Sequence, residues 1–243
     1  MKCFVINLDS ATKRLAHWTE QWNKWGGGKY ERFSAVNGKQ CWKTLPKVWN
    51  GKTAQWWQWI RNGRCLTKSE VGCAASHLSI YEKMIKEQIP YVAIFEDDMV
   101  FCSNIGLLFS KLEQVLNPQI PCVYLLSTGE KDGDFRLASL KTEVCAGGYV
   151  VTLAAAERLL KLNTPLSVPV DAWGRWRMLG VELMKCEPRL CGHWARTEFG
   201  SMMDNEKDKR NGIGYKIWFY SIRIVDRVLL RVYSFILALK TKS

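Results

Sequence analysis

The sequence lacks the short motifs by which many enzymes hold a nucleotide or a catalytic group. It contains no P-loop, no G-x-G-x-x-G, no G-x-S-x-G and no H-E-x-x-H. If the chain binds a nucleotide, we therefore expect a metal ion and the ends of β-strands to hold it, rather than a glycine-rich loop.

Long apolar runs and paired cysteines are also absent. No run approaches the roughly 18 apolar residues that a transmembrane helix needs, and Asp9 interrupts an N-terminal stretch that is too short for a signal peptide. None of the nine cysteines forms a C-x-x-C pair, which favours reduced, mostly buried thiols. We therefore expect a cytoplasmic protein. The basic C-terminal segment described below leads us to expect that it is peripheral on the inner face of the cytoplasmic membrane.

The composition is that of a folded protein. The chain has 243 residues, of which 47% are hydrophobic and 24% charged, which fits one large domain or a domain with a tail. The 35 Lys and Arg residues outnumber the 23 Asp and Glu residues, leaving a net charge of +12. Such a balance favours a polyanionic partner, which could be nucleic acid, an acidic membrane surface or a phosphorylated ligand.

Apolar runs alternate with helical patterns along the chain. The runs predict buried strands at 3–8, 33–36, 91–95, 122–126 and 147–151. Helical spacing of apolar residues predicts helices at about 10–25, 67–88 and 154–162, and the middle one starts with the capping box Thr67-Lys68-Ser69-Glu70. This alternation predicts an α/β fold with a mixed, mostly parallel central sheet flanked by helices.

Three segments depart from this pattern. Residues 40–64 hold five of the twelve tryptophans and predict an irregular excursion, either a satellite core or a surface on which a sugar stacks. Residues 127–140 predict a polar loop. Residues 201–243 predict a polar linker and a basic amphipathic C-terminal helix, which either docks on anionic lipid or packs on the core.

The acidic triplet Glu96-Asp97-Asp98 follows a fully apolar strand. Ligands of open α/β sheets bind at this end of the strands, and adjacent carboxylates repel one another unless a cation is near. Carboxylate oxygens suit Mn²⁺ or Mg²⁺. A solvated turn that caps a helix is the alternative interpretation, and the residues alone leave both open.

Three further residues are candidates for chemistry. His77 lies on a helix predicted to be covered on two sides, so on its own it indicates a core histidine. His193 follows Cys186 and Cys191 in a poor zinc pattern, and we predict instead that it completes a metal shell. Asp171 precedes Trp173 and caps a short helix, accepts a proton from a sugar hydroxyl, or does both.

Six short sequence segments, which follow one another in a fixed order along the chain, resemble the motifs of a known family. They are Phe4-Val-Ile-Asn-Leu-Asp9 with Arg14, residues 33–38 (FSAVNG), 66–77 (LTKSEVGCAASH), 93–98 (AIFEDD), 147–149 (GGY) and 169–171 (PVD). With these blocks the chain resembles glycosyltransferase family 25 of the lipooligosaccharide galactosyltransferase type, over roughly residues 3–200.

The resemblance implies a GT-A-like single domain at 1–200. It also implies Mn²⁺ (or Mg²⁺) and inverting transfer of a hexose, most often galactose, from a UDP-sugar to a glycolipid oligosaccharide. Asp98 would be the direct metal ligand, and Glu96 would bind either the metal or, like Asp97, the ribose. The predicted nucleotide pocket is completed by Asn7, Leu8, Arg14, Ser76 and His77. Asp171 is the predicted catalytic base.

Two other interpretations remain. The chain could be a basic nucleic-acid- or membrane-binding module without catalysis, which would explain the net charge. The scattered basic residues and the acidic triplet argue against nucleic acid as a partner. It could also be a transferase that retains configuration or uses another nucleotide-sugar.

Overall fold

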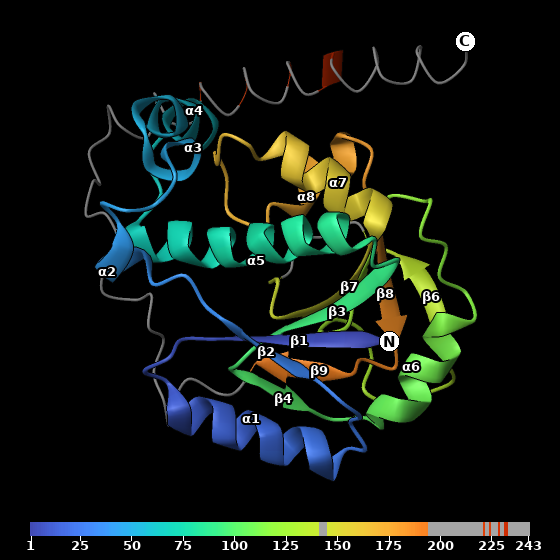
Figure 1. Ribbon diagram of the computed structural model, residues 1–243. Helices are drawn as coiled ribbons and strands as arrows, with labels where there is room; N and C mark the ends of the chain where they lie inside the picture. Colours follow the sequence, from blue (N-terminus) through green and yellow to red (C-terminus); the bar gives the residue numbers. More distant parts are fainter. Residues whose placement is uncertain (141–144, 194–220, 222–223, 225–227, 229–230, 233–243) are drawn as a thin grey trace.

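The computed structural model describes residues 1–140, 145–193, 221, 224, 228, 231 and 232. A seven-stranded sheet lies between two layers of helices (Figure 1), and its strand order is β2-β1-β3-β7-β5-β8-β6. The strands of this sheet are β1 (Lys2–Asn7), β2 (Glu31–Ser34), β3 (Tyr91–Glu96), β5 (Cys122–Leu125), β6 (Arg136–Ser139), β7 (Gly148–Thr152) and β8 (Glu182–Glu187). A second, two-stranded sheet pairs β4 (Met99–Phe101) with β9 (Cys191–His193).

The described helices form two layers and a peripheral group (Figure 1). One face of the sheet is covered by α5 (Lys68–Glu87), α7 (Leu153–Leu162) and α8 (Trp173–Met178). The other is covered by α1 (Thr12–Lys24) and α6 (Ile105–Glu113). The peripheral group comprises α2 (Gly38–Cys41), α3 (Lys47–Asn50) and α4 (Lys52–Asn62).

The strand directions confirm the predicted fold class. Strand β1 pairs in parallel with β2 and β3, and β5 pairs in parallel with β8. Strand β7 runs antiparallel between β3 and β5, and β6 runs antiparallel to β8 at the edge. Strands β2, β1, β3, β5 and β8 therefore share one direction, which gives a mixed, mostly parallel sheet flanked by helices.

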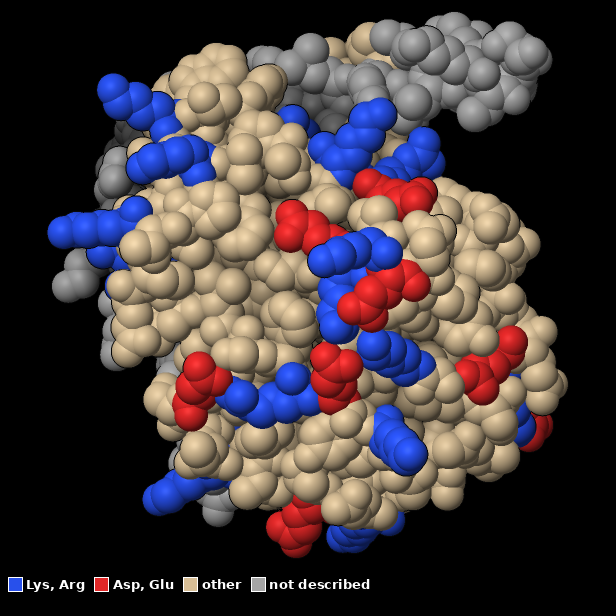
Figure 2. Space-filling model, in the orientation of Figure 1, with Lys and Arg blue, Asp and Glu red and all other residues tan. Residues whose placement is uncertain are grey.

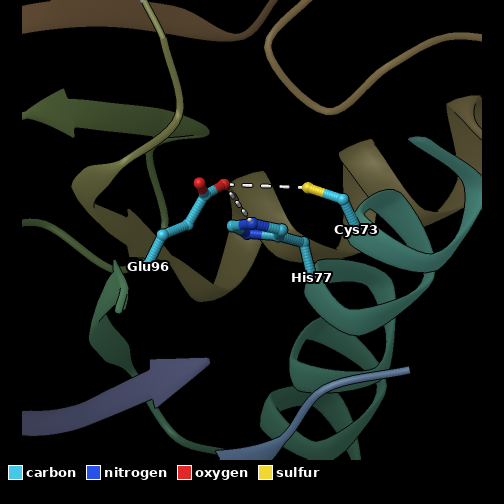
Figure 3. Close-up of side chains that lie close together, drawn as sticks. All are labelled: Cys73, His77 and Glu96. Carbon is cyan, nitrogen blue, oxygen red and sulfur yellow. Dashed lines mark hydrogen bonds and ion pairs between the residues drawn. The ribbon is translucent and has the colours of Figure 1, made fainter. Parts of the chain in front are cut away.

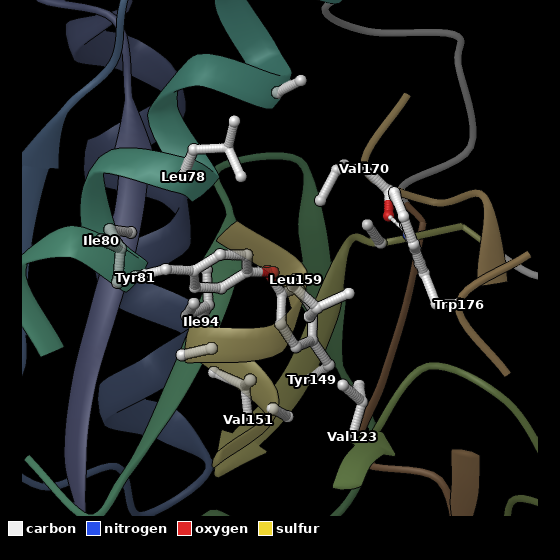
Figure 4. Close-up of a cluster of buried hydrophobic side chains, with 14 of the residues drawn as sticks. Leu78, Ile80, Tyr81, Ile94, Val123, Tyr149, Val151, Leu159, Val170 and Trp176 are labelled. Carbon is white, nitrogen blue, oxygen red and sulfur yellow. Dashed lines mark hydrogen bonds between the residues drawn. The ribbon is translucent and has the colours of Figure 1, made fainter. Parts of the chain in front are cut away.

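Each face of the sheet has its own hydrophobic core. In β1, Phe4 and Ile6 face the core under α5 and α7, whereas Cys3 and Val5 face the core under α1 and α6. Figure 4 shows the first core, where Tyr81 of α5 points toward Tyr149 of β7. Strands buried on both faces need apolar residues at every position, which explains the continuous apolar runs.

Helix α5 begins as its sequence predicts. The Thr67 hydroxyl accepts a hydrogen bond from the Glu70 amide at 3.1 Å, and the Glu70 carboxylate accepts one from the Thr67 amide at 2.8 Å. Ten of the twenty residues of α5 are buried, so the prediction that this helix is covered on two sides is confirmed.

Two segment predictions are wrong. Residues 40–64 are helical over much of their length, because the buried Ala54 and Gln58 give α4 an inward face that the run of tryptophans conceals. Within 127–140, residues 136–139 form β6, which gains its hydrogen bonds from β8 rather than from a pattern of its own. Strand β2 also begins and ends two residues before the predicted 33–36.

The end of the chain is described at five helical positions. These are Ser221, Ile224, Val228, Arg231 and Val232, all exposed. The predicted domain boundary at residue 200 and most of the predicted C-terminal helix lie outside the described residues. Among the described helices, none combines the length and the hydropathy required to cross a membrane.

Candidate active site

The carboxyl ends of β1 and β3 bring the first predicted residues together. Ile6 pairs with Glu96 in the parallel register, so the next residues along the two strands, Asn7 and Asp97, become neighbours. The Asn7 side-chain amide donates to Asp97 Oδ2 at 2.7 Å. Arg32 Nε in turn donates to Asn7 Oδ1 at 3.0 Å, which fixes the orientation of that amide.

Arg14 of α1 connects the two aspartates. Its Nε lies 3.2 Å from Asp97 Oδ1, and its Nη2 lies 3.0 Å from Asp98 Oδ2. The Arg14 and Asp97 side chains are only 13% and 10% exposed, whereas Asp98 is 35% exposed. Asp97 is therefore held from both oxygens as an internal anchor, and Asp98 is the member of the pair that solvent reaches.

The pKa of Asp97 reflects this burial. Desolvation raises the pKa to about 6, and the charges of Asp98 and Glu96 add to the increase. Arg14 and the hydrogen bond from Asn7 oppose it. The effect of desolvation on the pKa of Asp97 is therefore larger than the opposing effect of its ion pair with Arg14. The carboxyl group is still mostly ionised at neutral pH.

Glu96 faces α5, away from Arg14. Its Oε1 lies 3.4 Å from His77 Nε2 and 3.7 Å from Cys73 Sγ (Figure 3). The other ring nitrogen of His77, Nδ1, lies 2.6 Å from the Tyr149 hydroxyl, which lies 2.6 Å from that of Tyr81. His77 is thus a fully buried histidine, as its helix suggested, and also part of a polar chain that ends at the acidic triplet.

Asp171 belongs to a third segment of the chain. It is exposed and lies just before α8, whose N-cap is Ala172, so the predicted helix-capping role of Asp171 is wrong. Burial is the main cause that raises the pKa of the Cys73 thiol well above its usual range, and the charges of Glu96, Asp171 and Asp98 contribute. The charge of Asp171 therefore acts on the same thiol as the charges of Glu96 and Asp98.

The turn after β3 excludes the interpretation that the acidic triplet caps a helix. Residues 97 and 98 form a turn that leads directly into strand β4, so the triplet does not cap a helix. A short strand follows because Met99 and Phe101 pair with β9 and bury their side chains in the core under α1.

Three predicted residues have other surroundings or lie outside the description. The Leu8 carbonyl accepts from the Ala11 amide at 2.8 Å in the turn after β1. The buried Ser76 hydroxyl accepts from the Val36 amide and donates to the Gly72 carbonyl, both at 2.8 Å. Strand β9 pairs His193 with Met99, but the His193 side chain lies outside the described residues. Contacts of these residues with a nucleotide or metal stay predictions.

Sequence reasoning missed two members of the site. Cys73 precedes His77 by four residues, the spacing that places both on one helix face, so this signal was available. Tyr149 lies in the apolar strand β7, where its sequence context is typical of a core residue, and only the structure reveals the contact between its hydroxyl and His77.

Comparison with known families gives a match over most of the chain. The model of glycosyltransferase family 25, described as an LPS biosynthesis protein family, matches residues 1–173. The chain belongs to glycosyltransferase family 25. The matched range includes the ends of β1 and β3, the acidic triplet and Asp171.

Family 25 relatives differ in the names they carry. A cattle (Bos taurus) protein named "Probable inactive glycosyltransferase 25 family member 3" is 32% identical over 69% of this chain and 30% of its own length. A "Putative glycosyltransferase" of Haemophilus influenzae is 29% identical over 70% of this chain and 61% of its own length. The "Lipooligosaccharide biosynthesis protein lex-1" of the same organism is 37% identical over 22% of this chain and 18% of its own length. The chain thus spans less than two thirds of each of these relatives.

Proposed function

We propose that this chain is a metal-dependent, inverting glycosyltransferase that moves a hexose, galactose by preference, from a UDP-sugar to a lipooligosaccharide or lipopolysaccharide acceptor. The observation that carries the proposal is the convergence of Asn7, Arg14, Asp97 and Asp98 at the ends of β1 and β3. The charge of Asp171 acts on Cys73 together with those of Glu96 and Asp98. In α/β sheets this end of the strands is the usual ligand site.

The residues at this site fit Mn²⁺ or Mg²⁺. Asp98 offers a carboxylate that is partly exposed and whose Oδ2 lies 3.0 Å from Arg14 Nη2. Glu96, two residues before it, adds negative charge. Oxygen ligands and accumulated negative charge are what a hard divalent cation prefers. Asp98 would hold the cation, with Glu96 and His193 as further candidates. When bound, the cation supplies Lewis-acid stabilisation for the negative charge of a leaving diphosphate.

The protein's own groups divide the remaining work. Arg14 and Asn7 hold Asp97, so the turn that presents Asp98 keeps one conformation. Asp171, which is exposed, accepts the proton of the attacking acceptor hydroxyl, because inversion needs a base on the side of the sugar opposite the leaving group.

The acceptor side is formed by α4. Its Trp56 and Trp59 are 57% and 43% exposed, which provides aromatic surface for a sugar. The buried Gln58 donates to the Leu166 carbonyl at 3.1 Å, so α4 is attached to the segment that leads to Asp171. This attachment supports an acceptor that lies between α4 and Asp171.

The C-terminal helix supports a location on an anionic membrane surface. Ile224, Val228 and Val232 follow one another at four-residue spacing and are 62%, 54% and 52% exposed, while Arg231 adds positive charge. Apolar side chains on one face and basic ones beside them are typical of interfacial helices. Sedimentation with anionic vesicles tests this: deletion of 215–243 should abolish binding, and unchanged binding would contradict it.

Release of UDP is the direct test of the enzyme. Purified chain is incubated with a panel of nucleotide-sugars, with Mn²⁺ or with EDTA. We expect hydrolysis of one UDP-sugar that EDTA and Asp98→Asn abolish. Asp171→Asn should abolish transfer but keep UDP binding, and the matched control Asp134→Asn, in an exposed loop, should change neither.

If no UDP-sugar is hydrolysed in this assay, a measurement of UDP binding distinguishes two explanations. Metal-dependent binding of UDP without turnover, measured by calorimetry, would mean that the site binds the donor but does not catalyse transfer, as the name of the cattle relative suggests for that protein. Absence of UDP binding would favour the binding module.

A nucleic-acid-binding module is less well supported. Across the centre of the face in Figure 2, basic side chains are interspersed with acidic ones instead of forming a continuous stripe. Neighbouring acidic groups weaken the attraction for a phosphate backbone. A salt-sensitive gel shift would favour this second function, and no shift at low salt would dismiss it.

A further inference from the structure

Three potential metal ligands of different chemical types meet beside the acidic triplet. They are Cys73 Sγ, His77 Nε2 and a carboxylate oxygen of Glu96, and all three atoms lie within 4.8 Å of one another. Figure 3 shows the two helical side chains and Glu96 pointing toward a common centre. The cluster differs from the Asp98 site, because it combines sulfur and nitrogen with a single oxygen.

Two of the three distances between the ligand atoms agree with a tetrahedral zinc shell. Zinc binds sulfur at about 2.3 Å, and imidazole nitrogen and carboxylate oxygen at about 2.0–2.2 Å. A tetrahedron with those bond lengths has a sulfur–oxygen edge of about 3.6 Å and a nitrogen–oxygen edge of about 3.4 Å. The corresponding distances here are 3.7 Å and 3.4 Å.

Rigid elements hold the three ligands. Cys73 and His77 are four residues apart on α5, and Glu96 is the last residue of β3. His77 is fully buried, whereas Glu96 is 27% exposed and Cys73 is half-buried. The ligands are therefore preorganised, and the cluster remains accessible to an entering ion.

The surroundings of His77 suit a metal ligand. A ligating histidine usually donates its second ring N–H to an oxygen, which fixes the tautomer. Here Nδ1 lies 2.6 Å from the Tyr149 hydroxyl, which Tyr81 supports at 2.6 Å. With the proton on Nδ1, the lone pair of Nε2 points toward Glu96 and Cys73.

We propose that Cys73, His77 and Glu96 form a three-ligand zinc site, which assigns Glu96 to zinc rather than to the cation at Asp98. Thiolate and imidazole ligands favour zinc over Mg²⁺ and Mn²⁺, and three protein ligands leave a fourth position for water or a substrate group. Binding releases the thiol proton of Cys73, and the new sulfur–metal bond ties α5 to the start of the triplet.

Cobalt substitution gives the direct test. The full chain is stripped with a chelator, dialysed and titrated with Co²⁺, which adopts zinc geometries and develops a thiolate-to-metal charge-transfer band. We expect one equivalent of Co²⁺ with this band and with the visible spectrum of a tetrahedral ion, and we expect Zn²⁺ to displace it.

Variants assign the band to the site. Cys73→Ser should abolish the charge-transfer band, whereas the control Cys65→Ser, at an exposed cysteine, should keep it. Tyr149→Phe should weaken Zn²⁺ binding about tenfold to a hundredfold. Asp98→Asn should leave the band unchanged even where it abolishes Mn²⁺-dependent activity, which distinguishes this proposal from the proposed function.

Two results would overturn the proposal. One is a charge-transfer band that survives in Cys73→Ser, which would place the ion at another cysteine. The other is a wild-type chain with native circular dichroism and no band at stoichiometric Co²⁺, which would mean that the three groups form only a hydrogen-bonded network.

Discussion

Substitution of Gly72 by alanine tests how helix α5 is positioned against the segment after β2. Gly72 lies in α5, directly before Cys73, where the helix meets the segment after β2. A Cβ at this position would lie 2.5 Å from the Val36 carbonyl oxygen and 2.7 Å from the Gly38 amide nitrogen, whereas ordinary contact begins at 3.4 Å. Both neighbours are backbone atoms, so the segment or the helix must move by about 0.9 Å.

The expected magnitude is the balance of three effects. Alanine gains about 1 kcal/mol over glycine in a helix interior. Overpacking costs about 1–3 kcal/mol, and displacement of Val36 weakens its 2.8 Å hydrogen bond to Ser76, worth about 1 kcal/mol. With backbone on both sides, we take the upper half of the overpacking range and expect a net destabilisation of about 2 kcal/mol.

Urea unfolding followed by circular dichroism measures this change in the free energy of unfolding. The control is Gly28→Ala, because an added Cβ there meets no heavy atom within 4 Å, so its stability should stay the same or rise by up to about 1 kcal/mol. If Gly72→Ala were as stable as the wild type or more stable, helix propensity would outweigh the close approach and our reasoning would be refuted.

Two further predictions concern α5 and the acidic triplet. Thr67→Ala removes the capping box and should destabilise the fold by about 1–2 kcal/mol in the same assay; an unchanged urea midpoint would contradict the role of the cap. The pKa of Asp97 lies above its usual value of 3.8, at about 6, so its contribution to stability is present below pH 3.8 and is lost as the pH rises through about 6. The asparagine of Asp97→Asn does not titrate, so the free energy of unfolding of the variant lacks this pH dependence. The free energy of unfolding of the variant minus that of the wild type should therefore increase by up to about 3 kcal/mol from pH 3.8 to about pH 6. A decrease would show that the charge of Arg14 outweighs the desolvation of Asp97.

Sequence patterns predicted the helices and strands whose apolar spacing or capping residues lie within the element itself. Helix α5 has both a capping box and an apolar periodicity, and β1 and β3 are continuous apolar runs between polar residues. The short strands β4, β6 and β9 contain three or four residues each. Such strands depend on distant partners for their hydrogen bonds, and no local pattern reveals that pairing.

The site was predictable in its outline. Asn7 and the triplet follow strand ends, and the parallel pairing of β1 with β3 then makes them neighbours. The inward orientation of Glu96 was not predictable, because it depends on how α5 lies over the sheet. The sequence also does not indicate that Asp97 is buried and Asp98 only partly exposed, since that difference arises from the turn and from Arg14.

The attachment of α4 has a consequence for how this family could diversify. Gln58 and Asn62 of α4 bond the backbone carbonyls of Leu166 and Ser167, and Arg61 bonds the Ser167 hydroxyl. The segment before Asp171 is therefore held by α4 together with Asn163, which bonds Ser167 and Val168. Asp97 and Asp98 are held instead by Arg14 of α1 and by Asn7 of the sheet. If the proposed function holds, the acceptor and donor regions have separate supports, and we expect replacement of the exposed Trp56 and Trp59 of α4 to change the acceptor without disturbing the donor region.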